Sequence, residues 1–260
     1  MAESALLTTL EEGVFTITIN RPKVNALTTT TITEMQGLFK QAGRDPQVRC
    51  VLLTGQGKVF SAGQDLTEVK QTEDLSYRYH LLRTYNPLIV QIRQIEKPVL
   101  AAINGAISGA ALGIALACDL RIAAEEARFV VGFAGIGLAP DSAVSLLLPA
   151  LIGLGRAAEF TFSNAPIRAD QALAWGLVNR LAPTEELTRQ AIAWARQLAA
   201  GPIRAMGLAK RDFNKAVLGN LEQLLDYEAH IQDIAGKGEE HQEGVRAFLE
   251  KRAPNWPGSA

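Results

Sequence analysis

Residues 97–119 read KPVLAAINGAISGAALGIALACD, and this stretch decides the fold. Val99–Ile103 is an unbroken apolar run after a proline, which is typical of a buried parallel strand, and Asn104-Gly105 supplies a turn. We expect a helix to follow. Nearly every residue between Gly109 and Cys118 is small or aliphatic, so this helix has no solvent face and lies inside the protein. Taken alone, the stretch also fits an ordinary strand-turn-helix unit of any α/β core.

The first turn of this buried helix is a candidate binding site. The leading N–H groups of a helix have no internal partners and carry the positive end of the helix dipole. They can therefore hold an oxygen that is gaining negative charge. Gly109 and Ala110 are small enough to leave room for such an oxygen.

The segments before this stretch alternate between strands and helices. Alternation around Glu12-Gly13 predicts a β-hairpin of residues 5–10 and 14–19. A helix with Ile32 and Met35 on its apolar face follows a run of threonines that can cap it. Residues 49–54 predict a buried strand, and a small-sided loop, residues 60–66, comes after it. Apolar residues from Leu75 to Ile95 predict one or two helices, which Pro87 should break or kink.

The segments after the stretch change from mixed to helical. Residues 120–124 and 129–131 predict short strands, residues 132–140 predict a loop, and Asp141 should begin another helix. Further helices are expected at residues 184–199, 203–217, 221–234 and 244–251. We therefore expect an α/β core over residues 1–200 and a helical region over residues 201–260.

Composition excludes several classes of function. The 260 residues are 48% hydrophobic and carry a formal net charge of −1. Because the 26 basic and 27 acidic residues are interspersed, nothing points to nucleic acid or to an anionic membrane. Cys50 and Cys118 lie in apolar surroundings and are expected to be buried thiols, which suits a reducing cytoplasm. We expect no signal peptide and no membrane span.

Histidines and acidic residues offer no clear metal site. His80 and His230 lie in helix patterns without a partnered nucleophile, which favours surface or packing roles. No dinucleotide-type or phosphate-loop glycine pattern follows the first strand. A cluster near the C-terminus is expected to be a solvated helix end rather than a metal site, and comprises Glu239, Glu240, His241 and Glu243.

Several motifs in order resemble the crotonase superfamily of acyl-CoA enzymes, the enoyl-CoA hydratase/isomerase group, over essentially the whole chain. The resemblance implies a spiral of ββα units, the α/β fold called crotonase or ClpP-like, and a helical C-terminal region that forms trimers, commonly paired as hexamers. No cofactor is implied, because coenzyme A is part of the substrate. The motifs are Asn20-Arg21-Pro22, Asn25-Ala26-Leu27, residues 60–66 (FSAGQDL), Lys97-Pro98 through Cys118-Asp119, residues 175–178 (WGLV), and residues 243–252 (EGVRAFLEKR).

The resemblance also implies which residues contact the substrate. Two backbone N–H groups, at Gln64 and Ala110, would hold the thioester oxygen next to Gly109; the alternative for Gln64 is an ordinary loop glutamine. Lys23 is a candidate for the CoA phosphates, although its loop is one residue shorter than usual. Phe248 and Lys251 would complete the CoA site of a neighbouring subunit. The CoA channel would be lined by Ser61, Ala62, Asp65 and Leu66.

Departures from the family pattern indicate the chemistry. Hydratases of this family use two glutamates to position and split water, and here those positions hold Gly113 and Phe133. Asp141 matches an acid of some isomerase branches, most closely the one acting on the ring epoxide of phenylacetyl-CoA, although an aspartate there is also a common helix N-cap. The resemblance thus implies an isomerase. The alternatives are an enoyl-CoA hydratase, a dehalogenase with Asp141 as nucleophile, and a non-catalytic acyl-CoA-binding or RNA-binding member.

Overall fold

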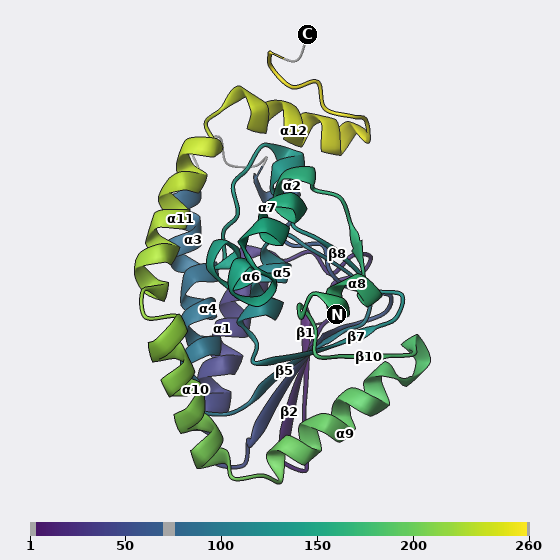
Figure 1. Cartoon of the computed structure of the whole chain (residues 1–260), viewed down its shortest axis with the longest axis vertical. Coiled ribbons are helices and arrows are strands. Elements are labelled where there is room, and N and C mark those ends of the chain that lie inside the picture. Colours follow the sequence, from purple (N-terminus) through teal and green to yellow (C-terminus); the bar gives the residue numbers. More distant parts are fainter. Residues whose placement is uncertain (1–3, 70–75, 259–260) are drawn as a thin grey trace.

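Two sheets organise residues 4–69 and 76–258, the part of the chain that this computed structural model describes (Figure 1). The larger sheet has the order β1-β2-β3-β5-β7-β10, and only the β1–β2 hairpin is antiparallel. Its strands are β1 (Leu6–Glu11), β2 (Val14–Ile19), β3 (Cys50–Gly55), β5 (Val99–Ile103), β7 (Leu120–Ala124) and β10 (Arg180–Ala182). The smaller sheet is ordered β4 (Val59–Ser61), β6 (Ala106–Ser108), β8 (Arg128–Val130) and β9 (Ile167–Arg168).

The chain repeatedly places one strand in the larger sheet and the next in the smaller one. The pairs β3–β4, β5–β6 and β7–β8 follow this rule. The predicted hairpin and the strands β3, β5 and β7 are confirmed. The helix predicted after Asn104-Gly105 is confirmed as α5 (Ala110–Ala117), and the three-residue strand β6, which was not predicted, lies between the turn and this helix. Every residue of α5 is buried, as predicted.

Helices cover both sheets. The helix α1 (Thr29–Arg44) starts at Thr28, whose side chain accepts a hydrogen bond from the Thr31 N–H, so the predicted threonine cap is confirmed. The segment up to Ile95 forms two helices, as predicted, α3 (Tyr77–Arg83) and α4 (Tyr85–Gln94), and Leu75 lies outside the described residues. The break between them is at Thr84 and not at Pro87, because Pro87 lies in the first turn of α4, where proline is tolerated. The other helices before residue 200 are α2 (Leu66–Val69), η1 (Ala134–Ile136), α6 (Val144–Ile152), α7 (Leu154–Ser163), α8 (Ala169–Ala174), η2 (Thr184–Glu186) and α9 (Leu187–Ala199).

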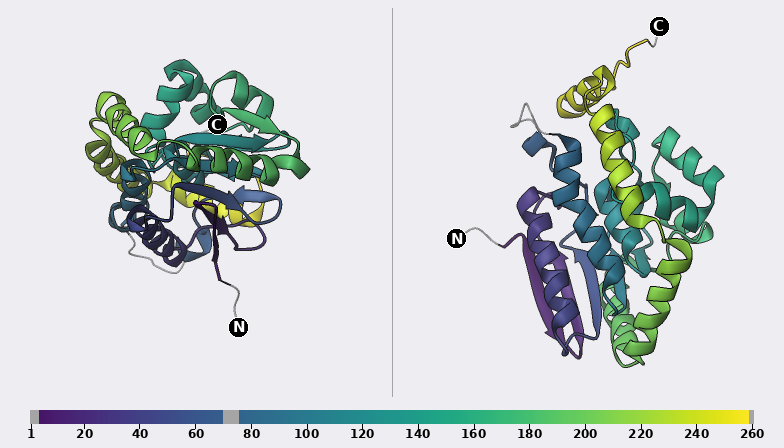
Figure 2. Two further views of the ribbon diagram at one scale, coloured as in Figure 1. Left: turned by 90° about the horizontal axis from the view of Figure 1, so that it is seen from below. Right: turned by 90° about the vertical axis from the view of Figure 1, so that its left-hand side faces the viewer.

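The segment after residue 200 contains α10 (Ile203–Val217), α11 (Leu221–Ala235) and α12 (Glu239–Glu250). The first two run along one side of the molecule, and α12 crosses above the smaller sheet (Figures 1 and 2). Buried Lys210 ties α10 to the core, because its Nζ lies 2.8 Å from Asp119 Oδ2. The helix α11 packs against α3, α4 and α6. None of the helices in the described residues is long and apolar enough to cross a membrane.

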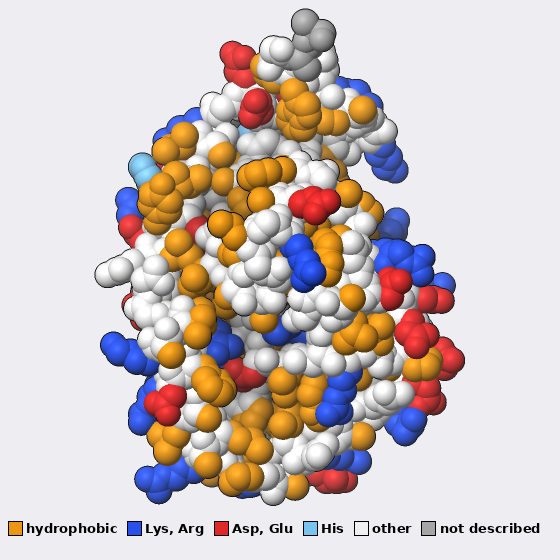
Figure 3. Space-filling model, viewed as in Figure 1, with side chains coloured by type: hydrophobic (Ala, Val, Ile, Leu, Met, Phe, Trp, Pro, Cys, Tyr) orange, Lys and Arg blue, Asp and Glu red, His pale blue; other side chains and the backbone are white. Residues whose placement is uncertain are grey.

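Burial corrects one expectation about α11. The sequence of this helix predicts an apolar stripe of Leu221, Leu224, Leu225 and Ala229 that an isolated monomer would expose. In the structure Leu221, Leu225 and Ala229 are buried against this chain's own core, and Leu224 is half-buried. The helices instead expose Leu208, Phe213 and Val217 on α10 and Tyr227 and Ile234 on α11. Apolar side chains are visible over this side of the molecule (Figure 3). Cys50 and Cys118 are buried free thiols, as predicted, and burial raises the pKa of each to about 12.

Candidate active site

The site begins where the loop after β4 meets the start of α5. Gly63 has a φ of +86°, which favours glycine, and a methyl group there would lie 2.8 Å from the Ser108 carbonyl oxygen. Only glycine therefore lets the loop approach the helix start this closely. Leu27 fixes the loop from the other side, since its N–H donates to Gly63 O at 2.7 Å and its carbonyl accepts from the Asp65 N–H at 2.9 Å.

These contacts leave two backbone donors side by side. Within the described residues, neither the Gln64 N–H nor the Ala110 N–H donates a hydrogen bond to the protein. Ala110 is the first residue of α5, so its N–H also carries part of the positive end of the helix dipole. Both residues line the same cavity. The pair can hold one oxygen that becomes negative.

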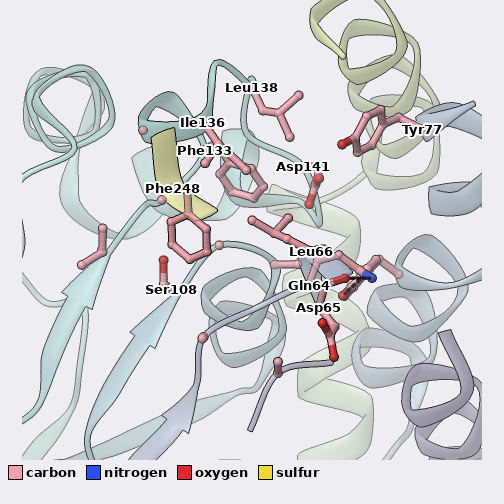
Figure 4. A pocket seen from close by; sticks show the side chains of 18 of the residues that line it. Gln64, Asp65, Leu66, Tyr77, Ser108, Phe133, Ile136, Leu138, Asp141 and Phe248 are labelled. Atoms are coloured by element: carbon pink, nitrogen blue, oxygen red, sulfur yellow. Dashed lines mark hydrogen bonds between the residues drawn. The ribbon is translucent and has the colours of Figure 1, made fainter. Parts of the chain in front are cut away.

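The cavity has a volume of about 430 Å³ and is largely apolar. Asp141 points into it between the rings of Phe133 and Tyr77, opposite Gln64, and Phe248 closes another side (Figure 4). Of the residues expected to contact substrate, the structure brings nine to this cavity: Ala62, Gln64, Asp65, Leu66, Gly109, Ala110, Phe133, Asp141 and Phe248.

Three expected contact residues are placed elsewhere. Ser61 is fully buried beneath the loop, where its hydroxyl donates to Asn25 O and accepts from the Gly63 N–H. It thus supports the loop and does not line the cavity. Lys23 is exposed and adjoins Val24, a residue of the cavity wall, and Lys251 is exposed at the end of α12.

Asp65 and Asp141 are carboxylates of opposite character. Burial acts to raise the pKa of Asp65, but hydrogen bonds from Thr67 and Arg21 outweigh it and hold the pKa below its usual value. Burial raises the pKa of Asp141 to about 6 against the opposing hydrogen bonds from Gln232 and Ser142. Asp141 is therefore the cavity carboxylate suited to exchange protons near neutral pH.

Asp141 does not cap the helix that follows it, so the N-cap alternative is wrong. The helix α6 begins at Val144, its N-cap is Ala143, and the Asp141 side chain makes no bond to it. Glu228 of α11 caps the helix instead, because its carboxylate accepts hydrogen bonds from the Ala143 N–H at 2.8 Å, from the Ser145 N–H at 3.1 Å and from the Ser145 hydroxyl. Burial raises the pKa of Glu228 to about 7, and the charge of Asp141 contributes.

Position 113 has no room for a side chain. A methyl group on Gly113 would lie 2.5 Å from Ser142 O and 2.6 Å from Ser142 Cβ. The segment that carries Asp141 thus fills the space into which a glutamate from α5 would project. Phe133 is 5% exposed, so the second position is filled by an apolar ring. Neither position offers a carboxylate to activate water.

The side chain of Gln64 is held from two helices. Its Oε1 accepts from the Tyr85 hydroxyl at 2.7 Å and lies 3.2 Å from His80 Nε2. His80 lines the cavity and packs edge-on against Tyr85, in line with the expected packing role, and burial lowers its pKa. The side chain is thus clamped by α3 and α4, while the bonds of Leu27 to Gly63 and Asp65 hold the backbone on both sides of the Gln64 N–H.

The helix α12 lies over this chain's own cavity. Phe248 and Leu249 line it, and a contribution of Phe248 to the CoA site of a neighbouring subunit stays a prediction. His241 is 5% exposed and not part of a solvated helix end: Nδ1 lies 2.7 Å from Ile136 O, and Nε2 lies 2.7 Å from the Tyr77 hydroxyl. Since Nδ1–H donates to the carbonyl, Nε2 of the neutral ring accepts from Tyr77.

Sequence reasoning missed Tyr77, Tyr85, Glu228 and Gln232. Each lies on an amphipathic helix, where a polar residue on an apolar face looks like an ordinary interruption of the pattern. The available signal was the pair Glu228 and Gln232, which are four residues apart and share the face of α11 that carries Leu221 and Leu225. A carboxylate and an amide on an apolar face require buried partners.

The paired sheets, the two free N–H groups and the covered cavity define the crotonase class of fold. The sequence profile of the enoyl-CoA hydratase/isomerase family matches residues 9–259, and the chain belongs to this family. It is 38% identical over 259 residues to the 1,2-epoxyphenylacetyl-CoA isomerase of Escherichia coli (strain K12), with 97% of this chain and 98% of that protein covered. The fold and family expected from the sequence are thereby confirmed.

Other relatives have different names. A 4-chlorobenzoyl coenzyme A dehalogenase-2 from an Arthrobacter species is 37% identical, and the match covers 88% of this chain and 84% of that protein. A short-chain-enoyl-CoA hydratase of Clostridium acetobutylicum is 34% identical, with 93% of each chain covered. The crystal structure of an enoyl-CoA hydratase from Mycobacterium avium subsp. paratuberculosis K-10 has a TM-score of 0.89 at 34% identity, covering 98% of this chain and 99% of that one.

Proposed function

We propose that this chain is an isomerase of acyl-CoA thioesters that acts on the ring 1,2-epoxide of phenylacetyl-CoA or on the double bond of enoyl-CoAs. The observation that carries the proposal is Asp141, a buried carboxylate with a pKa of about 6 in a cavity that also presents two free backbone donors. The 38% identity to 1,2-epoxyphenylacetyl-CoA isomerase supports the choice of acyl group.

The proposed reaction uses the two features together. The N–H groups of Gln64 and Ala110 bind the thioester oxygen and stabilise the enolate that forms when a proton leaves the adjacent carbon. The Asp141 carboxylate takes that proton and returns it to another carbon of the acyl group, so the electrons rearrange and no atom is gained or lost. On the ring epoxide, the carbon–carbon bond of the epoxide would break while both C–O bonds remain, which places the oxygen in a seven-membered ring. Asp141 would move a proton from the carbon next to the thioester to a ring carbon.

Single-base relay distinguishes this reaction from hydration. Hydration requires a water molecule to be held and deprotonated, and positions 113 and 133 provide no carboxylate for that task. The aromatic and aliphatic wall formed by Phe133, Leu138 and Phe248 also disfavours an ordered water. We therefore expect isomerisation to be much faster than formation of 3-hydroxyacyl-CoA.

The test is Asp141→Asn, assayed on a 3-enoyl-CoA and on the phenylacetyl-CoA epoxide. The substitution preserves shape, but an amide cannot relay a proton at neutral pH, so isomerisation should fall about a hundredfold or more while CoA-ester binding remains. Because the ionised form is the base, wild-type kcat/KM should fall as pH drops through about 6. Asp65→Asn is the matched control, and it should change KM more than kcat because the pKa of Asp65 lies too low for proton relay.

Products decide between the alternatives. Rapid conversion of crotonyl-CoA to 3-hydroxybutyryl-CoA would favour a hydratase. Release of chloride from 4-chlorobenzoyl-CoA that depends on Asp141 would favour a dehalogenase, in which this carboxylate attacks carbon. Full activity of Asp141→Asn on both isomerase substrates would overturn the proposed mechanism, and binding of acyl-CoA without turnover would identify a non-catalytic member of the family.

A further inference from the structure

Helix α11 contributes a residue that contacts the proposed acid. Gln232 is 0% exposed, and its Nε2 donates to Asp141 Oδ2 over 2.7 Å. The two residues are 91 positions apart in sequence, and α11 belongs to the helical C-terminal region. The position of the carboxylate therefore depends on α11, a helix whose residues do not line the cavity.

A second bond fixes the direction of the glutamine amide. Gln232 Oε1 accepts from the Ala139 N–H at 3.2 Å. A backbone N–H needs an acceptor, so this contact assigns the oxygen end of the amide to Ala139 and the NH₂ end to Asp141. Gln232 thus clamps the loop on both sides of Pro140.

The second oxygen of Asp141 is held as well. Its Oδ1 accepts from the Ser142 hydroxyl at 2.7 Å. Ser142 and Ala143 have φ angles of +55° and +63°, a conformation that non-glycine residues adopt only when the surroundings impose it. Glu228 imposes it by binding the N–H groups of Ala143 and Ser145. Each oxygen of Asp141 therefore has one lone pair that these two bonds do not use.

We propose that Gln232 is the positioning residue of the proton-relaying carboxylate: its amide orients Asp141 toward the substrate and stabilises the charged form. This inference rests on the proposed function only for its catalytic consequence. The contact between the amide and the carboxylate stands whichever reaction the family member performs.

The charged and titratable surroundings of Asp141 are few. Glu228 on α11, Tyr77 on α3 and Tyr85 on α4 interact with it electrostatically. The facing helices α5 and α6 carry no ionisable side chain. Gln232 and Ser142 are thus the described neighbours that donate to the carboxylate. Removing one of two donors should raise the pKa of Asp141 by about one unit.

The experiment compares Gln232→Met, which keeps the volume and removes both hydrogen bonds, with Gln232→Asn, whose shorter amide cannot reach. The titration of Asp141 is followed by carbon NMR of carboxyl-labelled aspartate, with Asp141→Asn identifying the resonance, and kcat/KM is measured against pH. We expect both the resonance and the acid limb of the rate profile to move upward by about one pH unit, and kcat to fall about tenfold or more.

Asn86→Leu is the matched control. The Asn86 amide is also buried and also holds α11, through Leu225 O at 2.9 Å, but it does not contact Asp141. It should leave the Asp141 titration unchanged even if it lowers the melting temperature.

The outcomes separate the two proposals. An Asp141 titration that stays the same in the Gln232 variants overturns the inference. A titration that moves while the rate profile stays in place supports the contact between Gln232 and Asp141 and overturns the role of Asp141 as the base.

Discussion

The lack of a side chain at Gly113 limits the reactions that the cavity can catalyse. A glutamate on α5 would have to enter the space held by Ser142, which a methyl group at position 113 already meets at 2.5 Å. The lack of a carboxylate at position 113 and the position of the segment that carries Asp141 therefore depend on each other. A hydratase-type site at this position would require the 141–143 segment to move, and with it the proposed acid.

A methyl group tests this coupling directly. Gly113→Ala should lower the free energy of unfolding by about 1–3 kcal/mol through overpacking. It should also slow isomerisation, because the added methyl group displaces Ser142, which is the neighbour of Asp141 in the sequence. Chemical denaturation measures the first effect, and kcat measures the second. Gly37→Ala, on the exposed face of α1, is the control, since nothing lies within 4 Å of the added methyl group. It should stabilise the protein by up to about 1 kcal/mol. A Gly113→Ala protein as stable and as active as wild type would contradict this account.

At the scale of helices and strands, the apolar pattern of the sequence predicted the elements that the hydrophobic effect buries in the core. The buried strand Val99–Ile103 and the fully buried helix α5 were legible because no polar residue interrupts them. The strand β6 was missed because three residues are too few to show alternation. The start of α6 was misassigned to Asp141 because its cap comes from Glu228, 85 residues away from Ala143. Local pattern cannot report a partner that folding brings from another helix.

The same reasoning applies to the site. The two backbone donors were predicted, because they follow from a glycine loop and a helix start that are both visible in sequence. Tyr85 and His80, which hold the Gln64 side chain, act through tertiary hydrogen bonds, and this role was not predicted. Sequence thus located the groups proposed to touch substrate and missed those that orient them.

Helix α12 docks through two glycines, and this contact can be broken selectively. A methyl group on Gly244 would lie 2.7 Å from the backbone of Ile136, and one on Gly137 would lie 2.6 Å from the backbone of Glu240. Gly244→Ala should therefore lift α12 from η1, speed amide exchange in α12 and weaken CoA-ester binding severalfold, because Phe248 and Leu249 leave the cavity wall. Gln242→Ala, on the exposed face of the same helix, should change neither quantity. Equal exchange rates in the two variants would show that the close approach does not hold α12.

At the scale of the whole molecule, the exposed side chains of α10 and α11 make association the expected state. Phe213, Val217, Tyr227 and Ile234 are each 58–66% exposed. Apolar groups gathered in this way usually mark an interface. We predict a trimer or hexamer, with three or six times the chain mass in sedimentation. Phe213→Glu should shift the distribution toward smaller species, whereas Lys215→Gln on the same helix should not. A wild-type protein that remains monomeric at micromolar concentration would refute the prediction.

Helix α12, which covers the cavity, belongs to the same chain as the rest of the cavity. This determines whether one subunit of an assembly can compensate for a defect in another. Gln64, Asp141 and Phe248 all belong to one polypeptide. Each copy therefore carries the two groups proposed to react and the covering Phe248 on a single chain. If Asp141→Asn chains and Gly244→Ala chains are denatured together and refolded into mixed particles, activity should equal the weighted average of the two parents. Defects on different chains have no means of compensating for one another.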